Sequence, residues 1–285
     1  MIIKLKNADF STKNIGMINL KRDLSSETKA IIAKFTRTLS RDQQFALQDM
    51  TDSLKEAGLW GKISNLYMPI LAGAVGESLT NIKTLSVDAT PDSAIYTIDS
   101  NGLNKAAGSS ESSIVLLNGS QQNLHLLGYN TTVLPANNVR DHESDVIAGA
   151  MNNSDGTLTI ARYAFDKYGQ SLCYTGVGTS AKTVSLNAPS AVFVLTPCFH
   201  GVSQTTLGNI AMGYGTNIAL KETPIDADGT YTDFPVRILG TPTHSLGAYG
   251  TWGLFSIGSG LSLTECKTYQ GIVDTFMDAM GVFVN

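Results

Sequence analysis

The stretch TWGLFSIGSGLSLTECKTYQGIVDTFMDAMGVFVN, from Thr251 to Asn285, is the part of this chain that decides its fold. It begins with a strand-like apolar run, Trp252–Ile257, which ends in the turn Gly258-Ser259-Gly260. Immediately afterwards, Ser262-Leu263-Thr264-Glu265 fits a capping box, in which a hydroxyl and a carboxylate satisfy free backbone N–H groups at the start of a helix. The sequence therefore predicts a strand that leads directly into a helix lying against a sheet.

The predicted C-terminal helix carries one apolar face. Its apolar residues recur at i, i+3, i+4, i+7, i+8 and i+11, which places them on a single stripe. We expect that stripe to pack on the sheet, and none of its residues is of a type typical of catalysis. The stripe consists of Tyr269, Ile272, Val273, Phe276, Met277 and Met280.

The composition indicates a β-rich body. Charged residues make up only 15% of the 285 residues, and there are 27 glycines; the usual charged fraction is about a quarter. Few charges with many turn-forming and β-branched residues favour short strands joined by turns. A net charge of −4 argues against a nucleic-acid binder, which would present a basic face. No run of about 18 apolar residues is present, so no membrane span is expected.

The cysteines predict neither a disulfide framework nor a zinc site. Cys173, Cys198 and Cys266 are odd in number, far apart and without CxxC spacing. We expect three reduced, mostly buried thiols in a protein assembled in the cytoplasm. The opening MIIKLKNADF lacks the apolar core of a signal peptide.

Three regions follow one another along the chain. Residues 1–24 alternate loosely between apolar and polar residues, which predicts an extended arm that makes assembly contacts. Residues 25–69 form a helical section, with Ser25 as a cap, a second capping box at Ser40–Gln43 and Gly58 as a helix stop. Residues 70–285 are expected to form a jelly-roll β-sandwich with the C-terminal helix packed on it.

Within the third region, short apolar or alternating runs are separated by Asn-Gly, Asp-Gly and other glycine-rich turns. This spacing is typical of a sandwich or jelly roll. The predicted strands are Ala94–Ile98, Ser113–Leu117, Leu124–Tyr129, Asp145–Ala150, Thr157–Tyr163, Thr183–Leu186, Ala191–Leu195, Asn217–Lys221, Val236–Leu239 and Gly253–Ile257.

Two segments together resemble a bacteriophage pattern. The first is Leu54-Lys55-Glu56-Ala57-Gly58-Leu59-Trp60-Gly61-Lys62-Ile63, followed by Tyr67-Met68-Pro69, Ala72-Gly73-Ala74 and Asn81-Ile82-Lys83. The second is Ser256-Ile257-Gly258-Ser259-Gly260-Leu261 with the helix from Tyr269 to Gly281. Chains with both segments are similar to phage virion components that carry a concanavalin A-like (LamG-like) jelly roll. The resemblance covers roughly residues 40–281 and is strongest at its two ends.

This resemblance implies a non-enzymatic structural component of the virion, in the tail, collar or fibre, assembled in the host cytoplasm. Its partners would be other virion proteins and further copies of itself, with a trimer favoured, and it would need no cofactor. The alternative function is a carbohydrate-binding adhesin that recognises a host surface glycan. Because both segments look structural, we expect Trp60, Trp252, Tyr269, Ile272 and Phe276 to belong to the core.

Glycoside hydrolysis is considered because some concanavalin-like sandwiches carry paired carboxylates on one strand. Asp141, Glu143 and Asp145 would share a face if that stretch were extended. Their Asp-x-Glu-x-Asp order is the reverse of the hydrolase pattern, and the neighbouring residues are polar. A surface loop is the favoured interpretation.

Sugar contacts and calcium are the remaining ligand predictions. Tyr231, Phe234 and Tyr249 lie in loop-like sequence and are the candidates for stacking on a sugar ring. Laminin-G-like domains often bind Ca²⁺ at loop carboxylates, which makes Asp226, Asp228 and Asp233 the candidate metal ligands. A solvated hairpin turn is the favoured alternative for these acids. The histidines, never paired at metal-binding spacing, are expected to be core or surface residues: His125, His142, His200 and His244.

Overall fold

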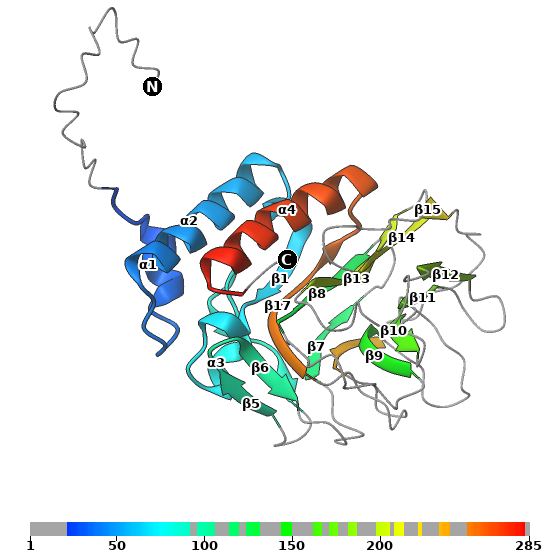
Figure 1. Cartoon of the computed structure of the whole chain (residues 1–285), viewed down its shortest axis with the longest axis horizontal. Coiled ribbons are helices and arrows are strands. Elements are labelled where there is room, and N and C mark those ends of the chain that lie inside the picture. The colour runs from blue at the N-terminus through cyan, green and yellow to red at the C-terminus, as the bar shows by residue number, and fades with distance from the viewer. Residues whose placement is uncertain are drawn as a thin grey trace, which may run out of the picture.

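The computed structural model describes residues 22–91, 96–105, 114–119, 124–131, 144–149, 162–166, 171–175, 182–186, 198–205, 208–213, 222–223, 234–239 and 250–282. In these residues the chain is mainly β, with two antiparallel sheets and a layer of helices (Figure 1). The predicted mainly β class is therefore confirmed.

The larger sheet has ten described strands, in the order β15-β14-β13-β8-β17-β1-β2-β3, and β6 pairs with both β17 and β5. Its central strand, β17, pairs with β1, β6 and β8. The strands are β1 (Ile63–Tyr67), β2 (Thr80–Asn81), β3 (Ser86–Val87), β5 (Tyr96–Asp99), β6 (Gly102–Lys105), β8 (Leu124–Asn130), β13 (Cys198–Thr205), β14 (Gly208–Gly213), β15 (Glu222–Thr223) and β17 (Gly250–Ser259).

The smaller sheet has seven described strands in the order β12-β11-β10-β9-β16-β7-β4. Strands β9 and β10 contact β13, and β11 and β12 contact β14, so the two sheets face each other. This arrangement is consistent with a sandwich-type fold. The strands are β4 (Thr90–Pro91), β7 (Ile114–Gly119), β9 (Ser144–Gly149), β10 (Arg162–Asp166), β11 (Ser171–Thr175), β12 (Lys182–Leu186) and β16 (Phe234–Ile238).

The helices begin where the sequence places capping residues. Helix α2 starts with the Ser40–Gln43 capping box, and helix α4 starts with the Ser262–Glu265 capping box. Gly58 follows α2 with φ +72°, a conformation that favours glycine after a helix end. The helices are α1 (Ser26–Ile32), α2 (Arg41–Glu56), α3 (Val75–Ser78) and α4 (Leu263–Ala279), with 3₁₀ turns η1 (Trp60–Lys62) and η2 (Pro69–Leu71).

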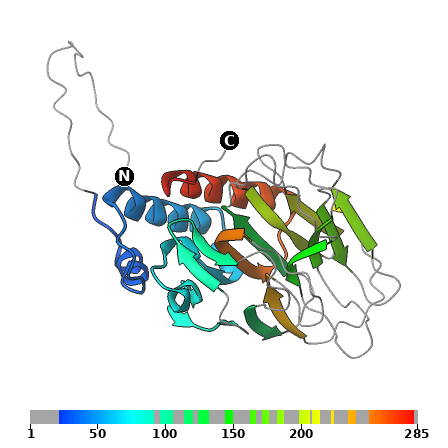
Figure 2. The same ribbon diagram turned by 60° about the horizontal axis from the view of Figure 1, so that its bottom comes forward.

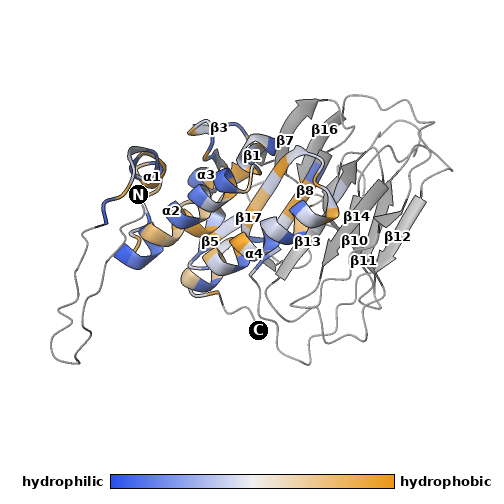
Figure 3. Cartoon of the chain, turned by 90° about the horizontal axis from the view of Figure 1, so that it is seen from above, coloured by the Kyte–Doolittle hydropathy of each residue, from blue (hydrophilic) through white to orange (hydrophobic). Residues whose placement is uncertain are grey.

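Helices α2 and α4 form a layer on one face of the larger sheet (Figures 1 and 2). They run antiparallel, because Gln43 near the start of α2 reaches the carbonyl of Met280 after the end of α4. Viewed from above, each helix carries both hydrophobic and hydrophilic residues (Figure 3). The main core lies beneath this layer and includes Leu47, Leu54, Leu66, Leu254, Val273 and Met277, all fully buried.

Several elements differ from the sequence prediction. Residues 63–67, expected within the helical section, form strand β1, because they pair with β17 from the far end of the chain. Helix α1 stops at Ile32, and Phe35 and Leu39 are buried from the loop that follows it. No predicted strand corresponds to β2, β3, β4, β6, β11, β13, β14 or β15. The predicted strands Ala191–Leu195 and Asn217–Lys221, and the arm up to residue 21, lie outside the described residues.

Candidate functional site

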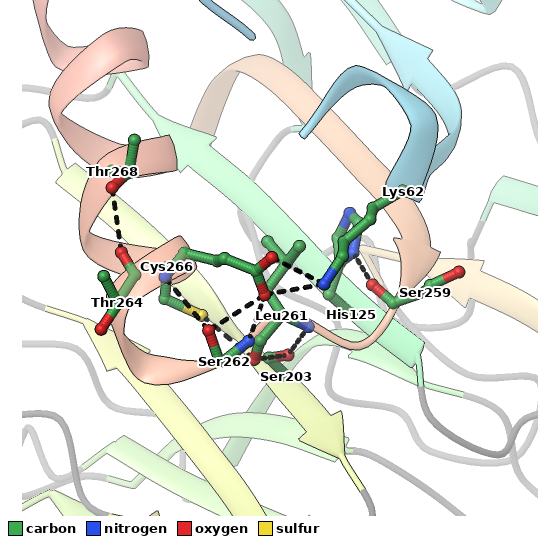
Figure 4. Close-up of polar contacts among 10 residues, drawn as sticks. Lys62, His125, Ser203, Ser259, Leu261, Ser262, Thr264, Cys266 and Thr268 are labelled. Carbon is green, nitrogen blue, oxygen red and sulfur yellow. Dashed lines mark hydrogen bonds and ion pairs between the residues drawn. The ribbon is translucent and has the colours of Figure 1, made fainter. Parts of the chain in front are cut away.

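A polar cluster with a buried centre and an exposed edge lies where β17 turns into α4 (Figure 4). It gathers side chains from η1, β8, β13, β17 and the first turn of α4. The cluster forms because Gly258 of β17 has no side chain; a Cβ there would lie 2.0 Å from the Lys62 carbonyl oxygen and 2.9 Å from the His125 ring. Its members are Lys62, His125, Ser203, Ser256, Ser259, Leu261, Ser262, Glu265 and Cys266.

His125 is fully buried and neutral at the centre of the cluster. Its Nδ1 lies 2.7 Å from the Ser259 carbonyl oxygen, which can only accept, so Nδ1 carries the proton. Its Nε2 lies 2.9 Å from the Ser256 hydroxyl and accepts from it in this tautomer. Burial lowers the pKa of His125 to about 4. A histidine held in this way is a structural residue rather than an acid or base exchanging protons with solvent.

Ser203 and Cys266 surround the backbone of Leu261. The Ser203 hydroxyl donates to the Leu261 carbonyl oxygen at 2.7 Å and accepts from the Leu261 N–H at 2.6 Å. The Cys266 thiol lies 3.7 Å from the same carbonyl, and burial raises its pKa to about 12. Because the thiolate is the reactive form of cysteine, this thiol is not a nucleophile near neutral pH.

Lys62 and Glu265 form an ion pair at the edge of the cluster. The Lys62 ammonium lies 2.7 Å from Oε1 and 2.8 Å from Oε2 of Glu265. Glu265 also accepts from the backbone N–H of Ser262 at 2.9 Å. Burial alone would raise the pKa of Glu265, but the hydrogen bonds from Lys62 and Ser262 outweigh it and lower the pKa. The pair connects η1 to the first turn of α4.

These contacts define a joint, not an active site. The histidine is neutral and buried, the thiol is protonated, and the serine hydroxyls hold backbone or ring atoms. A nucleophile or general base must reach a substrate, and this geometry leaves His125, Ser203 and Cys266 no access to one. The cluster instead fastens β8, β13, β17 and η1 to the start of α4.

A second polar group lies at the β1–β2–β3 edge of the sheet. The Asp88 carboxylate accepts from the Tyr67 hydroxyl at 2.6 Å, from Asn81 at 3.0 Å and from Asn65 at 3.3 Å. Burial, followed by the Asp88 hydrogen bond, raises the pKa of Tyr67. The Asn81 side chain also accepts from the backbone of Leu66. Across the part of the chain that the structure describes, no group of three or more His, Cys, Asp or Glu residues could hold a metal ion.

The predicted ligand-binding residues are mostly outside the described ranges. This holds for Tyr231 and Tyr249 of the sugar prediction and for Asp226, Asp228 and Asp233 of the calcium prediction. Phe234 begins strand β16, and its side chain is not described. Of the acids considered for hydrolysis, Asp145 lies in β9, while Asp141 and Glu143 lie outside the described residues. Sugar and calcium binding therefore remain predictions.

The residues predicted to be structural fall into two groups. Trp252, Tyr269 and Phe276 are buried in the core. Trp60 and Ile272 are only partly buried. The ammonium groups of Lys55 and Lys83 lie 5.4 and 4.9 Å from the Trp60 ring centroid, so two cations cover this ring at the surface. Ile272 faces the space between α4 and α2.

Sequence reasoning missed the joint because its members are distant in the chain. In the sequence His125 is an isolated histidine, and Ser256 and Ser259 come beside it only through the β8–β17 register. Glu265 was recognised as a capping residue, and its local spacing carries no signal for Lys62. Only the presence of Lys62 and Ser256 within the two phage-like segments could have pointed to this place.

No helix among the described residues is both long and apolar enough to cross a membrane.

Comparisons with known proteins support the fold alone. No family model matches the chain, and no curated protein sequence does. The Trypanosoma rangeli sialidase superposes with a TM-score of 0.52 at 11% identity, over 81% of this chain and 39% of the sialidase chain. The chain thus spans well under half the length of that enzyme.

Two further solved structures are similar at lower scores. Domain 4 of AbnA, a GH43 extracellular arabinanase from Geobacillus stearothermophilus in complex with arabinotriose, has a TM-score of 0.49 at 12% identity, covering 73% of this chain and 98% of that domain. The HCR/D W1238A mutant has a TM-score of 0.48 at 12% identity, covering 77% of this chain and 52% of that one. The sialidase similarity, at so low an identity, supports a mainly β fold and carries no activity to this chain.

Proposed function

We propose that this chain is a non-enzymatic structural component of a bacteriophage particle, in the tail, collar or fibre, built on a concanavalin A-like jelly roll. One observation carries the proposal. The two segments that resemble virion components, Leu54–Ile63 and Ser256–Gly281, lie far apart in the sequence but form one body. Ile63 pairs with Gly258 across β1 and β17, and α2 packs against α4.

The residues of these segments also have a shared structural purpose. Gly58 ends α2, Gly258 allows β1 to approach β17, and Lys62 pairs with Glu265. The two segments that carry the sequence resemblance therefore belong to one structural unit, although they are far apart in the chain. The similar solved structures are not virion proteins, so the proposal rests on these segments and their placement.

The absence of an enzymatic role is part of the proposal. In the buried joint, the groups that could act as nucleophile or base are held by protein partners and kept uncharged. Such a joint suits a scaffold that must remain closed during assembly.

Localisation in the particle provides the test. Particles induced from the bacterium that carries the gene would be purified on a density gradient and analysed by mass spectrometry. We expect this chain to co-purify with the particles in a constant ratio to the other virion proteins, and antibody labelling in electron micrographs should place it on the tail, collar or fibre. A chain found only in the soluble lysate would contradict the proposal.

Carbohydrate binding is the second candidate, favoured by the sialidase-like fold. One of the similar structures is the Trypanosoma rangeli sialidase in complex with sialic acid, with a TM-score of 0.51 at 10% identity. In this chain Tyr231, Phe234 and Tyr249 would contact the sugar. A glycan array probed with the full chain, with and without a calcium chelator, tests this function and the predicted calcium site together. Loss of binding in Tyr231→Ala, with Tyr168→Ala as a control outside the predicted set, would locate the site.

A further inference from the structure

A groove of about 470 Å³ lies between α2 and α4 in the helical layer. Apolar side chains of both helices line it, including Phe45, Ala46 and Ile272. Its α2 side also carries Asp42 and Asp49, and its α4 side carries Lys267. Its volume falls within the roughly 300–1,000 Å³ typical of ligand clefts. The groove is therefore large enough for several apolar side chains, with acids beside them.

Gly271 leaves additional space in the groove wall. A Cβ built on Gly271 would meet no atom within 4 Å. Glycine inside a helix costs about 1 kcal/mol relative to alanine. No close contact within the described chain explains this glycine, so the space it leaves is available to another segment.

The chain enters its described part beside this same groove. The Arg22 guanidinium donates to Asp49, with Nη1 2.8 Å from Oδ2, and its carbon lies 5.1 Å from the centroid of the Phe45 ring. Arg41 donates to the Arg22 carbonyl oxygen at 3.1 Å. Asp49 and Phe45 both line the groove. The residues immediately before Arg22 therefore start at its edge.

The end of the N-terminal arm matches the groove in chemistry and reach. Residues 13–21, KNIGMINLK, contain two lysines, no acid and the apolar residues Ile15, Met17, Ile18 and Leu20. The lysines complement Asp42, since Asp49 is already paired with Arg22, and the apolar side chains complement the groove lining. Extended chain spans about 3.3–3.6 Å per residue, so two to five residues before Arg22 reach about 7–18 Å. Packed helices lie roughly 8–10 Å apart, which is within that reach.

We propose that the α2–α4 groove is the docking site of the chain's own N-terminal arm, with Met17, Ile18 and Leu20 seated in it. The same chain is the favoured source because Arg22 already holds it at the groove edge, and such a tether produces millimolar effective concentrations. Residues 1–12 stay available for contacts with other molecules. The docking does not depend on whether the protein is a virion component or a sugar-binding protein.

Hydrogen exchange of the full chain, read by mass spectrometry, tests the docking. Gly271→Met fills the groove without meeting other atoms at Cβ, and Gly271→Ala is the matched control that leaves it open. We expect amides of residues 15–20 to be protected by roughly tenfold or more in the parent and in Gly271→Ala, and unprotected in Gly271→Met. Leu20→Asp changes only the arm and should release it equally. The protection should not change on dilution.

Three results would overturn the proposal. The first is no protection of residues 15–20 in the parent protein. The second is protection that persists in both Gly271→Met and Leu20→Asp. The third is protection that falls on dilution, which would assign the groove to the arm of another copy. None of these results affects whether the chain co-purifies with phage particles, so the two proposals fail separately.

Discussion

The Ser203 side chain forms two hydrogen bonds with the Leu261 backbone: the hydroxyl donates to the carbonyl oxygen at 2.7 Å and accepts from the N–H at 2.6 Å. Both residues are fully buried, and 58 positions separate them in the chain. This pair fastens strand β13 to the residue that precedes the α4 capping box. The start of α4 is thus secured by a strand whose existence the local sequence did not reveal.

The first prediction follows from this pair. Ser203→Ala would leave a buried N–H and a buried carbonyl without their partner, at about 1–3 kcal/mol for each unsatisfied group. We expect the free energy of unfolding, measured in urea, to fall by about 2–6 kcal/mol in total. Thr268→Ala is the control, because that hydroxyl bonds the Thr264 carbonyl on an exposed helix face. Equal stability of the two variants would show that the Ser203 contacts are unimportant.

Two glycines supply a matched comparison. A Cβ at Gly258 would lie 2.0 Å from the Lys62 carbonyl oxygen, whereas a Cβ at Gly271 meets nothing within 4 Å. Gly258→Ala must therefore push β1 away from β17, and we expect a loss of about 3 kcal/mol or more, as for severe overpacking. Gly271→Ala should instead stabilise α4 by about 0.5–1 kcal/mol. Thermal unfolding of both variants checks the pair, and similar melting temperatures would contradict the close approach.

The buried face of α4 gives a third prediction. Phe276 is buried in the core, whereas Ile272 is only partly buried beside the groove. Phe276→Ala should cost about 3–5 kcal/mol through lost transfer energy and a cavity. Ile272→Ala should cost clearly less, because part of its side chain already contacts solvent. The melting temperatures of the two variants decide this, and an equal or larger loss for Ile272→Ala would reverse the assigned faces.

Asp274 gives a prediction in pH. Burial raises its pKa from 3.8 to about 6, so the folded state prefers the protonated carboxyl. The unfolded state releases this proton at lower pH, and the contribution of Asp274 to stability is therefore lost as pH rises from about 4 through 6. Asp274→Asn should be more stable than the parent at pH 7, by about 1–2 kcal/mol after solvent screening, and nearly equal to it at pH 4.

His125 gives stability the opposite pH dependence, and it is present in both the parent protein and Asp274→Asn. Because its pKa is lowered to about 4, the folded state prefers neutral histidine, and stability falls as pH drops from about 6.5 toward 4. The difference between the urea-unfolding free energies of the parent and Asp274→Asn, taken at each pH, therefore does not contain the His125 contribution. A difference that does not change between pH 4 and pH 7 would refute the raised pKa of Asp274.

Self-association is the fifth prediction. The phage resemblance implies a homo-oligomer with a trimer favoured, and symmetric closed assemblies are the common form of such proteins. Light scattering of the full-length chain at micromolar concentration should report a mass about three times that of one chain. Deletion of residues 1–12 should reduce it to a monomer while leaving the thermal unfolding transition in place. A parent protein that is monomeric in this measurement would contradict the predicted homo-oligomer.

By itself the sequence determined the helices at 41–56 and 263–279, the capping boxes at Ser40 and Ser262, and the mainly β class. These features depend on hydrogen bonds and side-chain faces repeated within a few residues, so a short window contains all the information. Predicted strands such as Leu124–Tyr129 were found because their apolar residues are locally continuous.

Only the tertiary structure decided the joint and the faces of the helices. Strand β1 exists because it pairs with β17, and His125 is neutral because the assembled fold buries it completely and so lowers its pKa. Strand pairing, burial and the pKa shifts they cause depend on groups more than a hundred residues away. A local sequence pattern does not specify which distant segment will pack against it. For the same reason Ile272, on the stripe with Phe276, came to face the groove rather than the sheet.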